Sequence, residues 1–311
     1  MDERGAIERL RRIATHTAAR GLLDDAALLE GWVLTHDTIA EGVHFFPDDP
    51  PASVGWKLVA VNLSDLAAKG ASPIAALLSL TLTGDDSWEV GFLDGVAEAC
   101  AAFGLALVGG DTIALPAGAP RVLGLTAIGK AGSATPSRDG GRPGDRLWLV
   151  GTLGDSAAGL AELRESRAAT GPLVDAYRRP FPLLEAGAAL APHATAMMDV
   201  SDGLLLDLSR MIAASGCGTE VDLEALPLSA AFMANRGIDR SARLFAATGG
   251  DDYALLAALP RDLDVNLTLC LPSAPSIACI GCLVAGASLS LADAEGPVPL
   301  PEHLGHEHRA F

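Results

Sequence analysis

The sequence of 311 residues has few of the features that mark nucleic-acid-binding or membrane proteins. Basic residues are outnumbered, with 22 Lys and Arg against 39 Asp and Glu, and the net charge of −17 argues against nucleic acid or an anionic membrane as a partner. The longest apolar run, residues 74–82, is far shorter than the roughly 18 residues that span a membrane. An acidic protein still binds phosphates where divalent cations bridge the two negative partners.

Cysteine is sparse, with five residues in a chain large enough to bury a core without disulfides. Reduced thiols are therefore expected. Cys279 and Cys282 have C-x-x-C spacing without a second pair, which favours two small core residues over a zinc or redox site. The charged start, Met1–Arg4, lacks the apolar core of a signal peptide, so we expect a cytoplasmic protein.

Two common phosphoryl-transfer signatures are also missing. The chain has neither the P-loop pattern G-x-x-x-x-G-K-[ST] nor the protein-kinase motifs. A kinase with this sequence would need another scaffold.

The composition that is present, 50% hydrophobic and 20% charged, is typical of a globular protein, and the length favours two domains. Strand and helix patterns alternate in both halves, which predicts an α/β (α+β) fold. A stretch rich in Gly, Pro, Ser and Arg over 132–144 marks the expected boundary, with domains at 1–137 and 138–311. The periodicity predicts helices over 1–20, 53–70, 87–103 and from 204 onward, and strands over 32–37, 74–82, 105–108, 121–130, 146–150 and 219–222.

One carboxylate stands on an apolar helical face. In the helix expected to open at Ser53 and close at Gly70, the 100° period places Asp65 on the same arc as Val54 and Leu58. An unpaired carboxylate there is costly, so it needs a donor or a cation. It either pairs with backbone amides or a lysine of the same helix, or it is a metal ligand.

Acidic residues recur with glycines where strands are expected to end. Each has an ordinary alternative, since Asp and Gly form turns and Ser201 or Asp202 is suited to cap the helix that follows. Carboxylates without a Cys/His set favour Mg²⁺ or Mn²⁺ over zinc, and Mg²⁺ commonly takes phosphate oxygens as well. The repeated residues are Asp24, Asp25, Asp37, Asp111, Asp199 and Asp251.

Seven motifs in order resemble the thiamine-monophosphate kinase family, of the superfamily that includes aminoimidazole ribonucleotide synthetase. The resemblance runs from about Gly21 to His308. Its motifs are Asp24-Asp25-Ala26-Ala27, Asp37-Thr38, Glu41-Gly42-Val43-His44-Phe45, Asn62-Leu63-Ser64-Asp65-Leu66-Ala67-Ala68, Gly109-Gly110-Asp111-Thr112, Asp199-Val200-Ser201-Asp202-Gly203-Leu204 and Gly249-Gly250-Asp251-Asp252-Tyr253.

The resemblance implies a two-domain aminoimidazole ribonucleotide synthetase-like fold, a homodimer joined through the N-terminal sheets, and ATP bound near that interface. It implies transfer of the ATP γ-phosphoryl group to thiamine monophosphate, which gives thiamine diphosphate. The acceptor is already an ionised phosphate, so no discrete acid or base is required, and Asp65 would bridge several Mg²⁺ ions.

The resemblance also implies roles for individual residues. The implied Mg²⁺ ligands are Asp25, Thr35, Asp37, Asp65, Asp111, Asp199 and Asp202. The nucleotide would contact Gly110, Asp111, Arg138 and Ser201, and the substrate would contact His44, Asp251 and His306.

The chain departs from the family pattern at several of these motifs. His36 precedes Asp37 where Ser or Thr is usual, Leu23 replaces a Gly, and Leu183 stands where Arg is common. Asp251 stands for a frequent Glu. His306 takes an aromatic position and forms an H-x-x-H-x-H run that suits either a solvated tail or a metal. Two alternatives stay open, a two-metal phosphohydrolase and a catalytically inactive Mg²⁺-nucleotide-binding protein.

Overall fold

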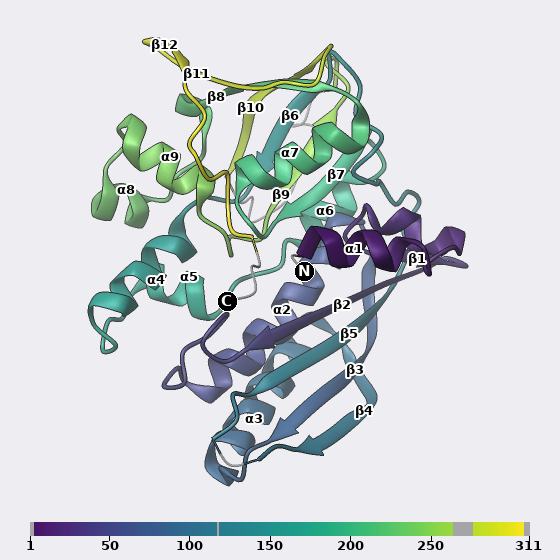
Figure 1. Ribbon diagram of the computed structural model, residues 1–311, viewed down its shortest axis with the longest axis vertical. Helices are drawn as coiled ribbons and strands as arrows, with labels where there is room; N and C mark the ends of the chain where they lie inside the picture. Colours follow the sequence, from purple (N-terminus) through teal and green to yellow (C-terminus); the bar gives the residue numbers. More distant parts are fainter. Residues whose placement is uncertain (1–2, 117, 264–275, 308–311) are drawn as a thin grey trace.

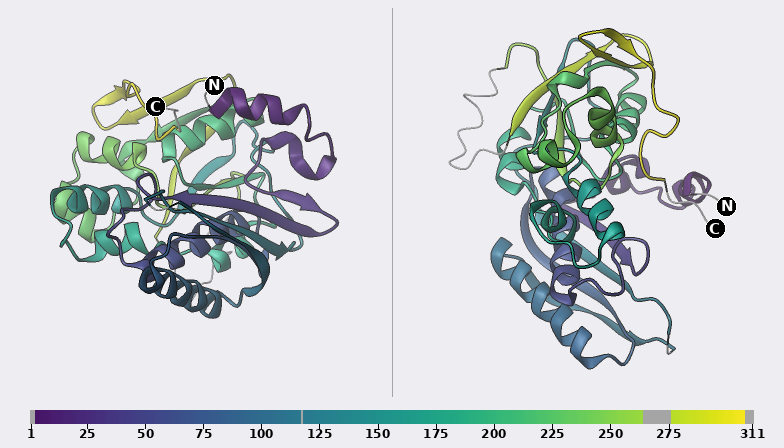
Figure 2. Two further views of the ribbon diagram at one scale, coloured as in Figure 1. Left: turned by 60° about the horizontal axis from the view of Figure 1, so that its bottom comes forward. Right: turned by 90° about the vertical axis from the view of Figure 1, so that its left-hand side faces the viewer.

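The computed structural model describes residues 3–116, 118–263 and 276–307, and they form two lobes that lie end to end (Figures 1 and 2). Each lobe is built around one mixed sheet, with five strands in the N-terminal lobe and seven in the C-terminal lobe. None of the helices in these ranges combines the length and the apolar character needed to cross a membrane. The architecture is therefore a mixed α/β fold of two lobes.

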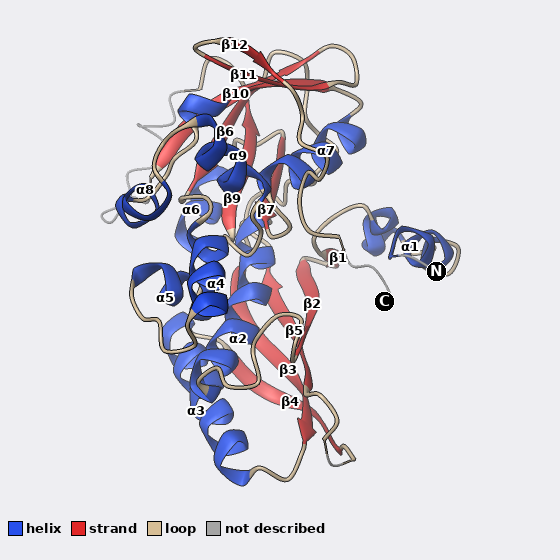
Figure 3. Cartoon of the chain, turned by 60° about the vertical axis from the view of Figure 1, so that its left-hand side comes forward, coloured by secondary structure: helices blue, strands red, loops and turns tan. Residues whose placement is uncertain are grey.

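The N-terminal sheet has the strand order β1-β2-β5-β3-β4, in which only β3 and β4 run parallel. Two long helices cover one of its faces, and its opposite face is left open by the described chain (Figure 3). The strands are β1 Ala27–Leu29, β2 Trp32–Ala40, β3 Ser72–Leu82, β4 Ala106–Ala114 and β5 Val122–Lys130, and the helices are α2 Pro51–Ala68 and α3 Asp86–Phe103.

The C-terminal sheet has the order β12-β11-β8-β10-β6-β9-β7, and helices pack on both of its faces. Its strands are β6 Arg146–Val150, β7 Ala196–Val200, β8 Gly218–Asp222, β9 Ala254–Leu259, β10 Ile277–Val284, β11 Leu289–Asp293 and β12 Gly296–Val298. Its helices are α4 Asp155–Glu165, α5 Pro172–Arg178, α6 Leu184–Leu190, α7 Leu204–Ser215, α8 Ala230–Arg236 and α9 Arg240–Thr248.

Helix α2 joins the lobes, because its last turn is buried in the C-terminal lobe. Ala67 and Ala68 belong to an apolar cluster with Leu190 of α6 and Met197 of β7. Gly187 allows this approach, since a Cβ there would lie 2.0 Å from the carbonyl oxygen of Ala67. Residues near the end of α2 therefore lie close to the end of β7.

Three predicted elements differ from the structure. The first helix, α1, spans only Glu3–Arg11, because His16 caps a separate 3-10 helix, Thr17–Leu22. Helix α2 begins at Pro51 and not at Ser53, since prolines suit the first helical positions, and the Ser53 hydroxyl donates to the Pro50 carbonyl oxygen. These corrections move boundaries only.

The third difference concerns the edge of the N-terminal sheet. Strand β4 does not end at the glycines but continues through 109–112, and every one of its residues is exposed. Strand β3, expected to be buried, is exposed on alternate residues, including Leu77 at 42%. The cause is the open face of the sheet, which an apolar run by itself does not reveal.

The described cysteines, Cys100, Cys217, Cys279 and Cys282, are free thiols, as expected. Cys279 and Cys282 both lie half-buried on β10, where burial raises the pKa of the Cys282 thiol.

Candidate functional site

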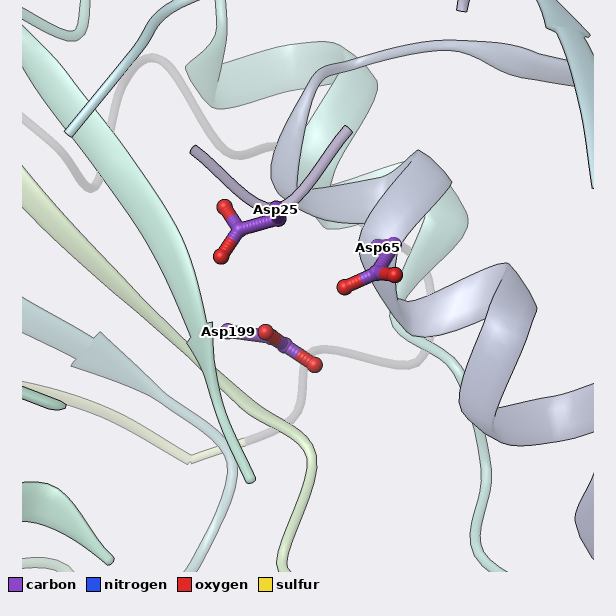
Figure 4. Close-up of side chains that lie close together, drawn as sticks. All are labelled: Asp25, Asp65 and Asp199. Atoms are coloured by element: carbon purple, nitrogen blue, oxygen red, sulfur yellow. The ribbon is translucent and has the colours of Figure 1, made fainter. Parts of the chain in front are cut away.

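Three carboxylates meet where the two lobes join. Asp25 lies just before β1, Asp65 lies on α2 and Asp199 lies on β7, and one oxygen of each falls within 4.8 Å of the others. Figure 4 shows the three side chains directed toward a common centre from three separate segments. Segments that are far apart in the sequence thus supply one site.

Asp65 does not pair with either lysine of its helix. Lys57 binds Asp251 and Lys69 binds Asp24, whereas Asp65 accepts a short hydrogen bond from the Thr35 hydroxyl. The interpretation of Asp65 as an ordinary ion-paired acid therefore does not hold.

The carboxylates around Asp65 resist ionisation. Burial, followed by the charges of Asp37, Asp199 and Asp25, raises the pKa of Asp65 well above its usual value. Burial and the charge of Asp25 raise the pKa of Asp199 to about 8, although Ser64 donates to it at 2.7 Å. The pKa of Asp37 rises to about 6, through burial and the charges of Asp25 and Asp202. Unneutralised negative charge is concentrated here.

Asp25 behaves in the opposite way. Burial favours its neutral form, but the charges of Arg138 and Lys69 outweigh burial and hold the pKa of Asp25 below its usual value. Arg138 Nε donates to Asp25 Oδ1 at 2.8 Å, and Lys69 Nζ lies 2.6 Å from Asp25 Oδ2. Asp25 is therefore a fixed anion.

This donor set fits divalent metal ions that prefer oxygen. The three grouped residues are all aspartates, so the set offers hard oxygen ligands without imidazole or thiolate. Burial and neighbouring carboxylates raise the pKa values of Asp65 and Asp199, and a positive charge bound beside them would favour their ionised forms. The residues present thus match Mg²⁺ or Mn²⁺ better than zinc.

Several other predicted residues border this cluster. Thr35 and Asp37 lie on the face of β2 that is turned toward α2, and Arg138 binds Asp25. Ser201 and Asp202 follow β7, and their backbone N–H groups donate to Asp207 at 3.1 and 3.0 Å. Neither caps α7, whose N-terminal cap is Gly203.

Gly110 and Asp111 are not brought to this cluster within one chain. Asp111 pairs in register with Ser79 of β3, which pairs with Gly124 of β5, which pairs with Thr38 of β2. Cross-strand partners share a face and neighbours along a strand alternate, so Asp111 lies on the open face, opposite to Asp37.

The predicted substrate residues His44 and Asp251 are linked by Lys57. The Lys57 ammonium donates to the His44 carbonyl oxygen at 3.3 Å and forms a short ion pair with Asp251. Asp251 has φ +72° and accepts from the Tyr253 hydroxyl at 2.7 Å. Because Lys57 belongs to α2 and Asp251 precedes β9, this pair connects the two lobes.

His306 lies beside the loop that carries Asp202. Its backbone N–H donates to the Asp202 carbonyl oxygen at 2.8 Å, and it lines a cavity of about 420 Å³ together with Leu206 and His303. The last histidine of the H-x-x-H-x-H run, at 308, is outside the described residues.

Sequence reasoning gave Lys69 and Asp207 no role at the site, and it named Asp24 only among the acidic strand ends. Asp207 is fully buried, binds Arg210, and has its pKa raised to about 7 by burial and Asp202. A polar residue inside the apolar run 204–208 was a signal for it. The pairing of Lys69 with Asp24 joins positions 45 residues apart, and nothing local indicates it.

Comparison with known proteins places both lobes in one class. Residues 23–131 match the N-terminal domain of AIR synthase related proteins, and residues 142–266 match the C-terminal domain. The fold and the acidic site at the junction of the lobes therefore define an AIR synthase related protein.

Similar chains within that class share one function. The chain is 40% identical over 253 residues to the thiamine-monophosphate kinase of Salmonella typhimurium, covering 78% of this chain and 76% of that protein. It is 38% identical to the enzyme of Caulobacter vibrioides, over 93% and 85% of the two chains. It also matches the structure of AaThiL complexed with AMPPCP and TMP, with a TM-score of 0.87, 30% identity and coverage of 99% and 97%. The chain belongs to the thiamine-monophosphate kinase family.

Proposed function

We propose that this protein transfers the γ-phosphoryl group of ATP to the phosphate of thiamine monophosphate and so forms thiamine diphosphate. The observation that carries the proposal is the group of carboxylates at Asp25, Asp65 and Asp199, together with its family. Two negatively charged phosphate compounds must approach each other, and a site with excess carboxylate accepts them only with divalent cations.

The proposed Mg²⁺ ligands are Asp25, Thr35, Asp37, Asp65, Asp111, Asp199 and Asp202. When bound, Mg²⁺ supplies positive charge against the phosphate oxygens and lowers the repulsion between donor and acceptor. Asp65 is held by the helix α2 within reach of the carboxylates of Asp25 and Asp199, so we propose that it would be the central ligand shared by several Mg²⁺ ions. The acceptor phosphate is ionised at neutral pH, and no side chain needs to remove a proton from it.

The nucleotide is assigned to Gly110, Asp111, Arg138 and Ser201. Arg138 is largely buried, and its bond to Asp25 keeps the guanidinium in a fixed position. A fixed guanidinium suits phosphate oxygens because its N–H groups form a rigid fork. Asp111 lies on the open face of the N-terminal sheet, so its assignment depends on a second copy or on a bound nucleotide that reaches that face.

The acceptor is assigned to His44, Asp251 and His306. The thiazolium ring of thiamine monophosphate is cationic, and the Asp251 carboxylate provides an electrostatic partner for it. Lys57 and Tyr253 hold that carboxylate between the two lobes. His306, next to Asp202, would pack on the substrate as an aromatic residue.

We also propose a homodimer that is formed through the open face of the N-terminal sheet. Four apolar side chains share this face by strand register and are 42–52% exposed: Trp32, Leu77, Ile113 and Val122. Large apolar side chains that are exposed on an uncovered sheet face favour an interface there. Leu77→Glu is expected to shift the protein to a monomer in sedimentation velocity, and an unchanged dimer would refute this interface.

The activity is tested by mixing the full chain with Mg²⁺, ATP and thiamine monophosphate and separating the thiamine phosphates by chromatography. Thiamine diphosphate and ADP are expected in equal amounts. Phosphate release without thiamine diphosphate would favour the two-metal phosphohydrolase, and nucleotide binding without turnover would favour the inactive binding protein. Asp65→Asn is the matched control for contaminating kinases.

A further inference from the structure

Lys69 is a buried cation beside the metal site. It is the C-terminal cap of α2, and its side chain is only 1% exposed. A lysine ammonium removed from water is unfavourable unless its donors and its charge are satisfied. The position of Lys69 therefore has to be explained by its partners.

The Lys69 ammonium has three partners, which come from two segments. It donates to Asp24 Oδ1 at 2.5 Å and to the Met197 carbonyl oxygen at 3.0 Å, and it lies 2.6 Å from Asp25 Oδ2. An ammonium has three N–H donors, so these partners use all of them.

Those contacts connect the three segments that carry the clustered carboxylates. Lys69 is four residues beyond Asp65 on α2, which places both near one face of the helix. It contacts Asp25 directly, and Met197 is two residues before Asp199 on β7. One side chain thus ties together the end of α2, the segment of Asp24 and Asp25, and the strand β7.

Lys69 also changes the charge of the site. Asp24 is bonded to Arg20 at 2.5 Å and Asp25 to Arg138, so each acid already has a guanidinium partner. The ammonium adds a third positive charge to this side of the cluster. Asp25, which the ammonium contacts, is grouped with Asp65 and Asp199, and neither of these two has an ion pair in the described part of the chain.

We propose that Lys69 is a built-in cation of the metal site, a positioning residue that fixes the carboxylates and permanently supplies part of the positive charge they require. Without it, bound divalent ions would have to balance a larger share of the negative charge of the cluster. The inference rests on the proposed metal site, but it does not depend on the kinase reaction.

The test compares thermal unfolding of the full chain without nucleotide, in EDTA and in Mg²⁺, for wild type and Lys69→Met. In EDTA, Lys69→Met is expected to unfold at a lower temperature, because Asp24 and Asp25 lose a shared counter-ion. Mg²⁺ is expected to raise the Tm of Lys69→Met at least about twice as much as that of wild type, since an ion that binds the folded state more tightly stabilises it more. A merely structural lysine would give equal Mg²⁺ increments.

Lys57→Met is the matched control, because Lys57 is also buried on α2 but binds Asp251. Its Mg²⁺ increment is expected to equal that of wild type. Equal increments in wild type and Lys69→Met would overturn the proposal, as would an increment in Lys57→Met as large as that in Lys69→Met. If Lys69→Met does not fold, Lys69→Gln, which keeps an N–H donor without charge, is judged by the same criterion.

The outcome separates this inference from the kinase assignment. A wild-type chain that responds to Mg²⁺ but forms no thiamine diphosphate would refute the proposed activity and leave the role of Lys69 standing. A chain whose Tm does not respond to Mg²⁺ in any variant would refute the role of Lys69.

Discussion

The two sides of the acidic site differ in how their charge is balanced. On one side, Asp24 and Asp25 face three cations, namely Arg20, Lys69 and Arg138. On the other side, Asp37, Asp65 and Asp199 form no ion pair with any residue that the structure describes. The carboxylates of the first side are paired with cations of the protein itself, whereas those of the second side depend on bound metal ions to stabilise their ionised forms.

The consequence is an opposite effect of the same substitution on the two sides. Removing a carboxylate from the unpaired side relieves repulsion, and removing one from the paired side leaves buried cations without a partner. On the paired side, removing a carboxylate should therefore lower both activity and stability. On the unpaired side, it should lower activity and raise stability.

The largest expected effect is on turnover in Asp65→Asn. The amide is a weaker ligand and carries no charge, so formation of thiamine diphosphate should fall by about 1,000-fold or more, equivalent to about 4 kcal/mol. In EDTA the variant should be at least as stable as wild type, because a carboxylate with a raised pKa is lost. Steady-state rates and thermal unfolding measure the two effects, and wild-type turnover would remove Asp65 from the metal site.

Asp25→Asn is expected to lose stability as well as activity. The substitution leaves Lys69 and Arg138 beside a neutral amide, and breaking a buried ion pair from one side costs about 3 kcal/mol. The free energy of unfolding at neutral pH, from urea denaturation in EDTA, gives the value. Stability equal to that of Asp65→Asn would contradict the division of the site into two sides.

Sequence alone predicted much of the fold because the elements carry local signals. The 100° period predicted the helix α2, in which almost every residue is buried and Asp65 is half-buried, and the helix predicted over 87–103 is found as α3. The apolar run at 146–150 and the strand at 219–222 are also found as β6 and β8. Such signals depend on neighbours along the chain.

Partner choice at the site was not predictable from local patterns. Lys57 binds Asp251, which is 194 residues away, and no periodicity reports such a contact. Asp111 was expected among the acidic strand ends, yet the strand continues through it and the sheet register turns it to the open face. Both outcomes depend on how strands and lobes pack, which is tertiary information.

The pH dependence of stability should also separate the two sides. The folded-state pKa values of Asp37 and Asp199 are about 6 and about 8, and both exceed the unfolded value of 3.8. Between the unfolded and the folded pKa of each group, the folded chain therefore binds more protons than the unfolded chain. Stability in EDTA should therefore be highest near pH 4 to 5 and decrease as pH rises through 6 and 8. The lowered pKa of Asp25 affects stability only at pH values below the unfolded-state pKa of this group, so it does not oppose the trend.

The measurement is the Tm in EDTA from about pH 5.5 to about pH 8.5, where we expect a decrease of several degrees. Mg²⁺ should raise the Tm most at the alkaline end, where the carboxylates are ionised. Asp199→Asn is the control and should have a flatter profile. A Tm that increases over this range would show that ionisation of the unpaired carboxylates does not destabilise the folded chain.

The smallest effect is expected for Asp207→Asn, because Asp207 combines features of both sides. It has one cation, Arg210, and its pKa is raised to about 7, so loss of its charge removes an ion pair and a source of repulsion at once. Asn keeps one oxygen to accept from the backbone N–H groups of Ser201 and Asp202. We expect a loss of about 1 kcal/mol in unfolding free energy, by urea denaturation, and a few-fold increase in KM for ATP with little change in kcat. Asp207→Ala removes that oxygen and should raise KM further, whereas equal KM values in the two variants would show that Asp207 does not position the loop at Ser201.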